Sequence, residues 1–177
     1  AQIGVRVDFF WTTIDNESEL LEKFGIQVLP FDMADFLRAV KKRAEENMSA
    51  YNKELESYKS WLITDSMKDE KGLINGLALR DELLKIGEEE DISAFSIKSF
   101  TSIGTELGPG TGLGMSLFQN HYPVGVESDL HGAISSVLIE AASAVNEPSF
   151  LPEYTVRHPA NDNAILLWHG MAPLALK

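Results

Sequence analysis

Short segments rich in β-forming residues alternate with longer segments of helical periodicity along this chain of 177 residues. The β-type segments are residues 2–10, 26–29, 92–100 and 124–126, and the helical ones are residues 15–24, 33–61, 71–89, 115–120 and 129–144. Strands that alternate with helices pair in parallel, because each helix carries the chain back to the same end of the sheet. The sequence therefore predicts an α/β fold with a Rossmann-like parallel sheet flanked by helices.

Capping residues indicate where several of these helices begin and end. Asp15 is a suitable N-cap for the first helix, and Gly25 is expected to end it in the C′ position. Asp32 is expected to cap the long second helix. Helical spacing also predicts which apolar side chains face inward. They are Phe36, Val40 and Ala44 in the second helix and Leu79, Leu83 and Ile86 in the third.

The character of the sequence changes after residue 100, where glycine becomes frequent. Residues 150–156 and 164–169 have the composition of strands, with a polar loop between them. We expect residues 1–105 to form the Rossmann-like part. Residues 106–177 are expected to carry the catalytic centre and to begin a second subdomain.

The chain has a formal net charge of −12 and no cysteine. An acidic surface repels phosphate backbones and anionic lipid heads, so nucleic acids and membranes are poor partners. The sequence also lacks the run of about 18 apolar residues that a membrane-spanning helix needs. Without cysteine, disulfides, thiolate nucleophiles and cysteine-ligated zinc sites are excluded. These properties predict a cytoplasmic protein.

A glycine-rich stretch at residues 108–114 is reminiscent of a phosphate-binding loop. It lacks the Lys-Ser/Thr pair of a Walker loop, and Leu113 breaks the spacing of a dinucleotide-binding motif. Pro109 also removes an amide donor. We therefore reject NAD and ATP and predict a flexible loop that leads into a helix. A dinucleotide- or phosphosugar-binding module built on this loop is an alternative, which would make the two glutamates described next dispensable.

Glu127 stands at the end of the apolar segment 124–126, directly before a helix. Ligands of parallel α/β sheets gather at the carboxyl ends of the strands, so Glu127 is well placed to face a site. Asp129 is expected to serve as the N-cap of the helix that follows. His131, one turn further on, is expected to be a surface or packed histidine.

Glu153 and His169 stand at or near the ends of the two later β-type segments. A glutamate in an apolar strand needs an edge position, a cationic partner such as Arg157, or a metal ion. His169 follows four apolar residues and a tryptophan. If the segments that carry these residues are neighbours in one sheet, Glu127, Glu153 and His169 can converge. Two carboxylates and one imidazole would suit Mn²⁺ or Mg²⁺ better than Co²⁺ or Zn²⁺.

Several motifs resemble those of the L-fucose and L-arabinose isomerase superfamily. The run 126–133 resembles the carboxylate–small–Asp segment of L-fucose isomerases, and Glu153-Tyr154-Thr155 with the later His158, Asn163 and His169 resembles a stretch of L-arabinose isomerases. The spacings from residue 127 to 153 and on to 169 agree to about a residue. Residues 21–28 and 99–102 resemble further elements of the same superfamily.

The resemblance implies a metal-dependent aldose–ketose isomerase acting on a pentose or a 6-deoxyhexose through an enediolate. Glu127 and Glu153 would be metal ligands and the acid/base pair, and His169 would be a third ligand. Asp129, His158 and Asn163 would support them from outside the ligand set. The ion would be Mn²⁺, with Mg²⁺ or Co²⁺ as substitutes, and a homo-oligomer is expected.

The resemblance also implies a further histidine from a C-terminal β-rich domain. The chain ends at Lys177, before any such domain, and begins without methionine. We therefore expect it to be a fragment that lacks full activity by itself. A non-catalytic domain of the same fold, serving in sugar binding or in assembly, is the alternative.

Overall fold

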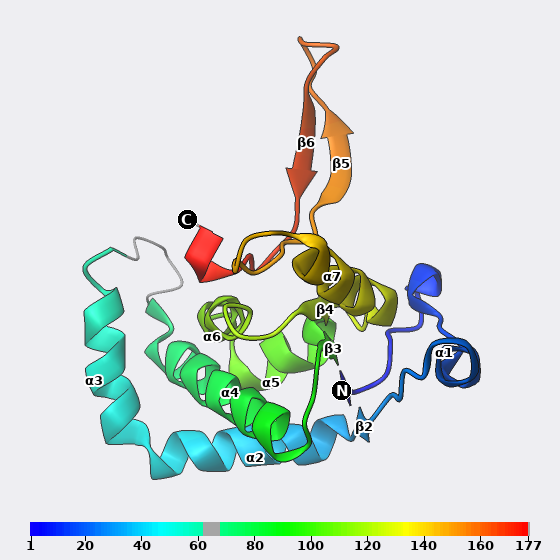
Figure 1. Ribbon diagram of the computed structural model, residues 1–177. Coiled ribbons are helices and arrows are strands. Elements are labelled where there is room, and N and C mark those ends of the chain that lie inside the picture. Colours follow the sequence, from blue (N-terminus) through cyan, green and yellow to red (C-terminus); the bar gives the residue numbers. More distant parts are fainter. Residues whose placement is uncertain (62–67, 177) are drawn as a thin grey trace.

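The computed structural model describes residues 1–61 and 68–176, and its centre is a four-stranded parallel sheet (Figure 1). The strands lie in the order β2-β1-β3-β4, with β1 in the middle pairing both β2 and β3. Their bounds are β1 (Gln2–Ile3), β2 (Pro30–Phe31), β3 (Phe95–Ile97) and β4 (Val124–Val126). The predicted α/β class with a Rossmann-like sheet is confirmed.

Seven helices surround this sheet within the described residues, and three short helical turns accompany them. The helices are α1 (Glu17–Phe24), α2 (Met33–Glu46), α3 (Met48–Tyr58), α4 (Glu70–Glu89), α5 (Gly104–Leu107), α6 (Thr111–Phe118) and α7 (Leu130–Ala142). The turns are η1 (Trp11–Thr13), η3 (Ser99–Ile103) and η4 (Leu174–Leu176). Helix α7 packs on β3 and β4, whereas α4 contacts α2, α3, α5 and α6. None of the helices in the described ranges is both long enough and apolar enough to cross a bilayer.

The core joins the strands to the inner faces of α2, α3, α4 and α6. All six apolar residues that helical spacing placed on the inward faces are buried, including Val40, Leu79 and Leu83 with no exposed surface. One cluster of buried side chains contains both Leu79 and Met115, and β3 pairs with β4. The sheet and the core therefore extend across residue 105, while the subdomain boundary there stays a prediction.

The N-terminal strand is much shorter than the predicted segment 2–10. Gly4 has a positive φ of 73° and turns the chain out of the sheet, and a Cβ there would lie 2.9 Å from Met33. Strand β2 begins at Pro30, after the predicted segment 26–29, and β3 covers only the middle of the predicted segment 92–100. Apolar composition located each strand, but the turns that follow the strands set their ends.

The predicted helix 33–61 is two helices, because the chain changes direction at Asn47. The predicted cap Asp32 is confirmed, since its carboxylate accepts the backbone N–H groups of Ala34 and Asp35. A straight helix would carry Tyr51 and Leu55 past the core, whereas the break lets α3 return and bury both. In α1 the cap is Asn16 rather than Asp15, and Gly25 ends the helix in the left-handed conformation as predicted.

The glycine-rich stretch 108–114 is a packed element rather than a flexible loop. It contains the first half of α6, which lies against α4. A Cβ on Gly114 would lie 1.8 Å from the carbonyl oxygen of Gly76, and one on Gly110 would lie 2.5 Å from the backbone nitrogen of Leu73. These glycines therefore allow two helix backbones to touch.

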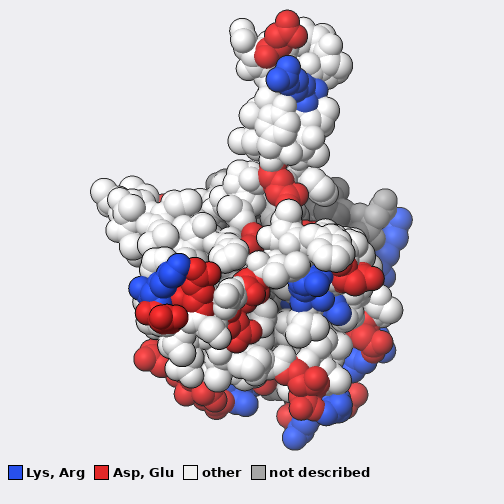
Figure 2. Space-filling model, turned by 90° about the vertical axis from the view of Figure 1, so that its right-hand side faces the viewer, with Lys and Arg blue, Asp and Glu red and all other residues white. Residues whose placement is uncertain are grey.

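The C-terminal β segments form a separate antiparallel hairpin of β5 (Glu153–Arg157) and β6 (Ile165–Trp168). Glu153 pairs with Trp168 at its base, and the register shifts between Tyr154 and Val156, so that Thr155 forms a bulge. Figure 1 shows the hairpin projecting from the body, and Figure 2 shows it as a narrow, mostly uncharged column. Every residue in both strands is exposed, so the hairpin belongs to neither the sheet nor the core.

A partly buried ion pair ties α3 to α4. The guanidinium of Arg80 donates hydrogen bonds to both carboxylate oxygens of Glu54, and its hydrogen bonds hold the pKa of Glu54 below the usual value. Because the folded-state pKa is lowered, this stabilisation is present above about pH 4.5 and is lost as the pH falls through the folded-state value.

We expect Glu54→Gln to lower the free energy of unfolding by about 1–3 kcal/mol at pH 7, since it removes the charge that bridges Arg80 across the two helices and leaves Arg80 paired only with Asp81 of its own helix among the described residues. The matched control is Glu56→Gln on the same helix, where the carboxylate is 67% exposed and, among the described residues, pairs with Lys59 alone, so a change below about 0.5 kcal/mol is expected. Urea unfolding at pH 7 and pH 3.5 measures both. A deficit of Glu54→Gln that did not shrink at the lower pH would contradict the ion-pair explanation.

Candidate metal centre

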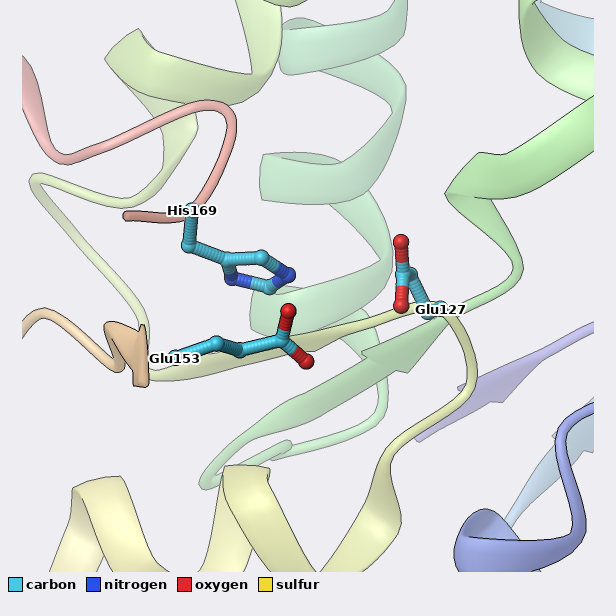
Figure 3. Close-up of side chains that lie close together, drawn as sticks. All are labelled: Glu127, Glu153 and His169. Carbon is cyan, nitrogen blue, oxygen red and sulfur yellow. The ribbon is translucent and has the colours of Figure 1, made fainter. Parts of the chain in front are cut away.

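Three side chains from distant parts of the sequence meet beside the carboxyl end of β4: Glu127, Glu153 and His169 (Figure 3). One ligand atom from each lies within 4.8 Å of the others. The sequence predicted that the three residues converge because their strands are neighbours in one sheet. That prediction is wrong, because the strands belong to two different sheets. Glu127 follows the last strand of the parallel sheet, whereas Glu153 is the first residue of β5 and His169 directly follows β6, both at the base of the hairpin. The base of the hairpin lies near the carboxyl end of β4, and this placement brings the three side chains together.

Glu127 is held in an unusual backbone conformation by the neighbouring strand. Both Glu127 and Ser128 have positive φ, at 61° and 63°. The N–H of Glu127 donates to the hydroxyl of Ser99 at 3.0 Å, and the N–H of Ser128 donates to the carbonyl of Ile97 at 2.9 Å. The end of β3 thus fixes the turn after β4 and directs the Glu127 side chain out of the sheet.

Glu153 is positioned by the segment that joins α7 to the hairpin. Glu140 on α7 accepts hydrogen bonds from both the backbone N–H and the hydroxyl of Ser149, at 2.7 and 2.8 Å. The side chain of Leu151 packs against Gly132, where a Cβ would lie only 2.7 Å from the Leu151 Cδ2 atom. These two contacts attach the segment to α7, so that Glu153 begins β5 close to the N-terminal end of that helix.

His169 follows β6 directly and is half-buried. Glu153 and Trp168 are register partners, which places the imidazole beside the Glu153 carboxylate. The chain then turns through Gly170 and Met171 onto α6, where the Gln119 side chain donates to the Met171 carbonyl. His169 therefore lies between the hairpin and the body.

Backbone strain is concentrated around this cluster. Among the described residues, five other than glycine have positive φ, and four of them lie in segments that border the cluster: Thr101, Glu127, Ser128 and Met171. A positive φ is unfavourable for residues with a Cβ and persists where surrounding contacts impose it. Such residues gather at functional sites, so the strain is a second observation that favours this location.

The two carboxylates of the cluster, Glu127 and Glu153, repel each other. Burial raises the pKa of Glu127; His169 opposes that rise, and the nearby charges of Glu153 and Asp129 add to it. No hydrogen-bond donor of the described residues binds the Glu127 carboxylate. A cation between the two carboxylates would relieve their repulsion.

The donor set fits a divalent ion in both chemistry and size. Three points no more than 4.8 Å apart fit in a circle of about 2.8 Å radius, and divalent ions bind such ligands at about 2.0–2.6 Å. An ion at the centre would need side-chain adjustments of less than about 1 Å. Oxygen-rich ligation with one nitrogen suits Mn²⁺ and Mg²⁺. Glu153 is exposed, so solvent can reach the cluster and supply further ligands.

The other residues singled out from the sequence have different positions. Asp129 caps α7, accepting the N–H of Gly132 at 2.8 Å, and it also contributes charge near Glu127. His158 and Asn163 lie at the far end of the hairpin, beyond Arg157, which is about 13 Å along β5 from Glu153. The structure does not bring these two to the cluster, because the strands carry them away from the base. His131 is exposed on α7.

Sequence reasoning did not assign roles to the residues that hold the ligands in place. Ser99, Gln119 and Glu140 are polar residues without a distinctive sequence context. Ser99 and Gln119 bind segments 28 and 52 residues away, and Glu140 binds the loop nine residues further on. The one sequence signal available was a polar residue at the end of an apolar helix, as at Gln119. That signal does not identify its partner.

The fold and the cluster together define an α/β protein with a candidate divalent-metal centre at the carboxyl edge of a parallel sheet. The chain is similar to a curated sulfoquinovose isomerase from Alkalicoccus urumqiensis, with 26% identity over 168 residues, covering 94% of this chain and 37% of that protein. It thus spans little more than a third of the length of that relative. No protein-family model matches the chain. The similarity supports a relation to sugar isomerases in general, not to the fucose and arabinose branch in particular.

Proposed function

We propose that this chain carries the active centre of a metal-dependent aldose–ketose isomerase. The observation that carries the proposal is the convergence of Glu127, Glu153 and His169 from three separate segments to within 4.8 Å. The likeness to a sugar isomerase over almost the whole chain supports the same class of reaction. The expected cytoplasmic location and homo-oligomeric state stay predictions.

The two glutamates and His169 would hold the ion, with Mn²⁺ expected and Mg²⁺ or Co²⁺ as substitutes. When bound, the ion supplies Lewis acidity that polarises the carbonyl of the sugar and stabilises negative charge on its oxygens. The chain holds the two carboxylates on independent supports, Ser99 for Glu127 and the Leu151 segment for Glu153. Each can therefore occupy its own side of a bound substrate.

The carboxylate pair moves the protons. One glutamate removes the proton from C2 of the aldose, which leaves an enediolate, and the pair returns a proton to C1. A second proton passes from the oxygen on C2 to the oxygen on C1, so that one C–H bond and one O–H bond break while one of each forms. Both glutamates end in the protonation state in which they began, and no other reactant is consumed.

The substrate is expected to be a pentose or a 6-deoxyhexose. The relative named for sulfoquinovose adds that sugar to the candidates. All three share the aldose carbonyl and the adjacent hydroxyl on which the reaction depends. The assay therefore compares ketose formation from L-arabinose, L-fucose and sulfoquinovose under the same conditions.

The test begins with metal binding by the purified chain. We expect Mn²⁺ to bind with one-site stoichiometry in calorimetry and to raise the melting temperature, since a ligand at 100 times its dissociation constant stabilises by about 2.7 kcal/mol. Affinity should fall on acidification, because the ligands bind in their deprotonated forms. Ketose formation should then require the added ion.

The matched control is Glu147→Gln, which removes an exposed carboxylate between α7 and the hairpin and should leave binding unchanged. Equal Mn²⁺ binding by a variant that lacks both Glu153 and His169 would show that the ion sits elsewhere on an acidic surface. A chain that binds none of Mn²⁺, Mg²⁺ and Co²⁺ would contradict the proposal.

A further inference from the structure

The hairpin by itself cannot hold the His169 side chain in position at the cluster. The residues before it form β6, whose side chains are exposed along the whole strand. An isolated two-stranded hairpin is marginally stable in water, so it cannot hold an imidazole at a defined place by itself. The support for His169 must therefore come from the residues after it.

Those residues are attached to α6 by two consecutive amide side chains. Gln119 donates from its Nε2 to the carbonyl of Met171, and also to the carbonyl of Met115 at 3.4 Å. Asn120 accepts the N–H of Ala175 at 2.8 Å with its Oδ1. Met115 is 1% exposed, so the attachment leads directly into the core.

The contact at Met171 is the one nearest to the imidazole. Met171 has a positive φ of 62° only two residues after His169, and its side chain packs partly on the core. Gln119 is itself only 8% exposed, so its two donated hydrogen bonds form away from competing water. Asn120 binds the chain six residues after His169, where it can hold the terminal turn but has little hold on the imidazole.

We propose that Gln119 is a positioning residue: its carboxamide fixes the turn from His169 to Met171 on α6 and so delivers the imidazole to the two carboxylates. The inference rests on the proposed metal centre, and it adds a residue that does not touch the ion. Outer groups that orient a ligand typically change metal affinity by about 10- to 100-fold when they are removed.

Gln119→Met tests this directly, because it keeps the length of the side chain and removes both donors. We expect Mn²⁺ affinity in calorimetry to fall by about 10- to 100-fold. Asn120→Ala is the matched control, since it removes the neighbouring attachment, and affinity within about threefold of the wild type is expected. In a His169→Ala background, Gln119→Met should have no further effect, because the residue acts through the imidazole.

A measurement without metal separates positioning from general stability. With ¹⁵N-labelled histidine, the resonances of His169 in the metal-free protein should shift or broaden in Gln119→Met, whereas those of His131 and His158, which lie on other elements, should not. Gln119→Asn keeps the amide on a shorter side chain, so an intermediate loss of Mn²⁺ affinity is expected. This variant replaces Gln119→Met in the test if the methionine variant does not fold.

Two results would overturn the inference: wild-type affinity in Gln119→Met, or an equal loss with and without His169. A wild-type chain that binds no metal would remove the proposed function instead. In that case the histidine resonances still decide whether Gln119 holds the imidazole: unchanged His169 resonances in Gln119→Met would overturn the inference there too.

Discussion

If the proposed function holds, replacing Glu127 by glutamine is expected to weaken Mn²⁺ binding by at least about 100-fold and to lower isomerase turnover by about 10²- to 10⁴-fold. Glutamine has nearly the same shape, but a neutral amide neither neutralises a cation nor exchanges protons with a sugar carbon. Calorimetry measures the first effect, and ketose formation by the intact enzyme measures the second.

The same substitution should not destabilise the metal-free protein. Glu127 accepts no hydrogen bond from the described residues, and its charge faces those of Glu153 and Asp129. Because the folded-state pKa of Glu127 is raised, ionisation above that pKa disfavours the fold, and glutamine removes this effect. An equal or higher melting temperature without metal is therefore expected. Near-normal turnover, or a loss of binding explained by unfolding, would reject the assignment.

Gly114→Ala is expected to reduce the free energy of unfolding by more than about 4 kcal/mol or to prevent folding. The new Cβ would lie 1.8 Å from the carbonyl oxygen of Gly76, and this oxygen belongs to the backbone of α4. Neither backbone can move aside without separating α4 from α6, and α6 also leads to Gln119. Urea unfolding of the purified variant measures the loss.

Gly112→Ala is the matched control, since it changes the same residue type in the same helix. Among the described residues its Cβ would meet Met171 alone, at 3.9 Å, which is ordinary van der Waals contact. Alanine is the better helix former by up to about 1 kcal/mol, so a neutral or stabilising effect is expected. Two variants of equal stability would show that the helices adjust to the extra atom.

Much of the fold could be predicted because local signals agree with the final packing. The spacing of Phe36, Val40 and Ala44 identified the buried face of α2, and the cap Asp32 and the terminator Gly25 are correct. The break at Asn47 could not be predicted, because no proline or glycine marks it. It is imposed by the position of the core, where Tyr51 and Leu55 must be buried.

The candidate site was predictable in its members but not in its construction. A carboxylate at the end of an apolar strand singled out Glu127, and the strand ends beside Glu153 and His169 pointed to the other two. Their convergence depends on how a separate hairpin is placed relative to the parallel sheet. The spacing of apolar residues in the sequence does not predict that placement. The same geometry explains why His158 and Asn163, close to Glu153 in sequence, lie at the opposite end.

The bulge at Thr155 bears on which changes of length the chain can tolerate. Side chains of a strand alternate between faces, so a slip of one residue along β5 would turn Glu153 away from the imidazole. A longer connection between His158 and Asn163 would extend the hairpin but leave the pairing at its base unchanged. Insertions and deletions in the outer loop of the hairpin should therefore be tolerated during evolution. The residue pairs nearest the body must keep their register.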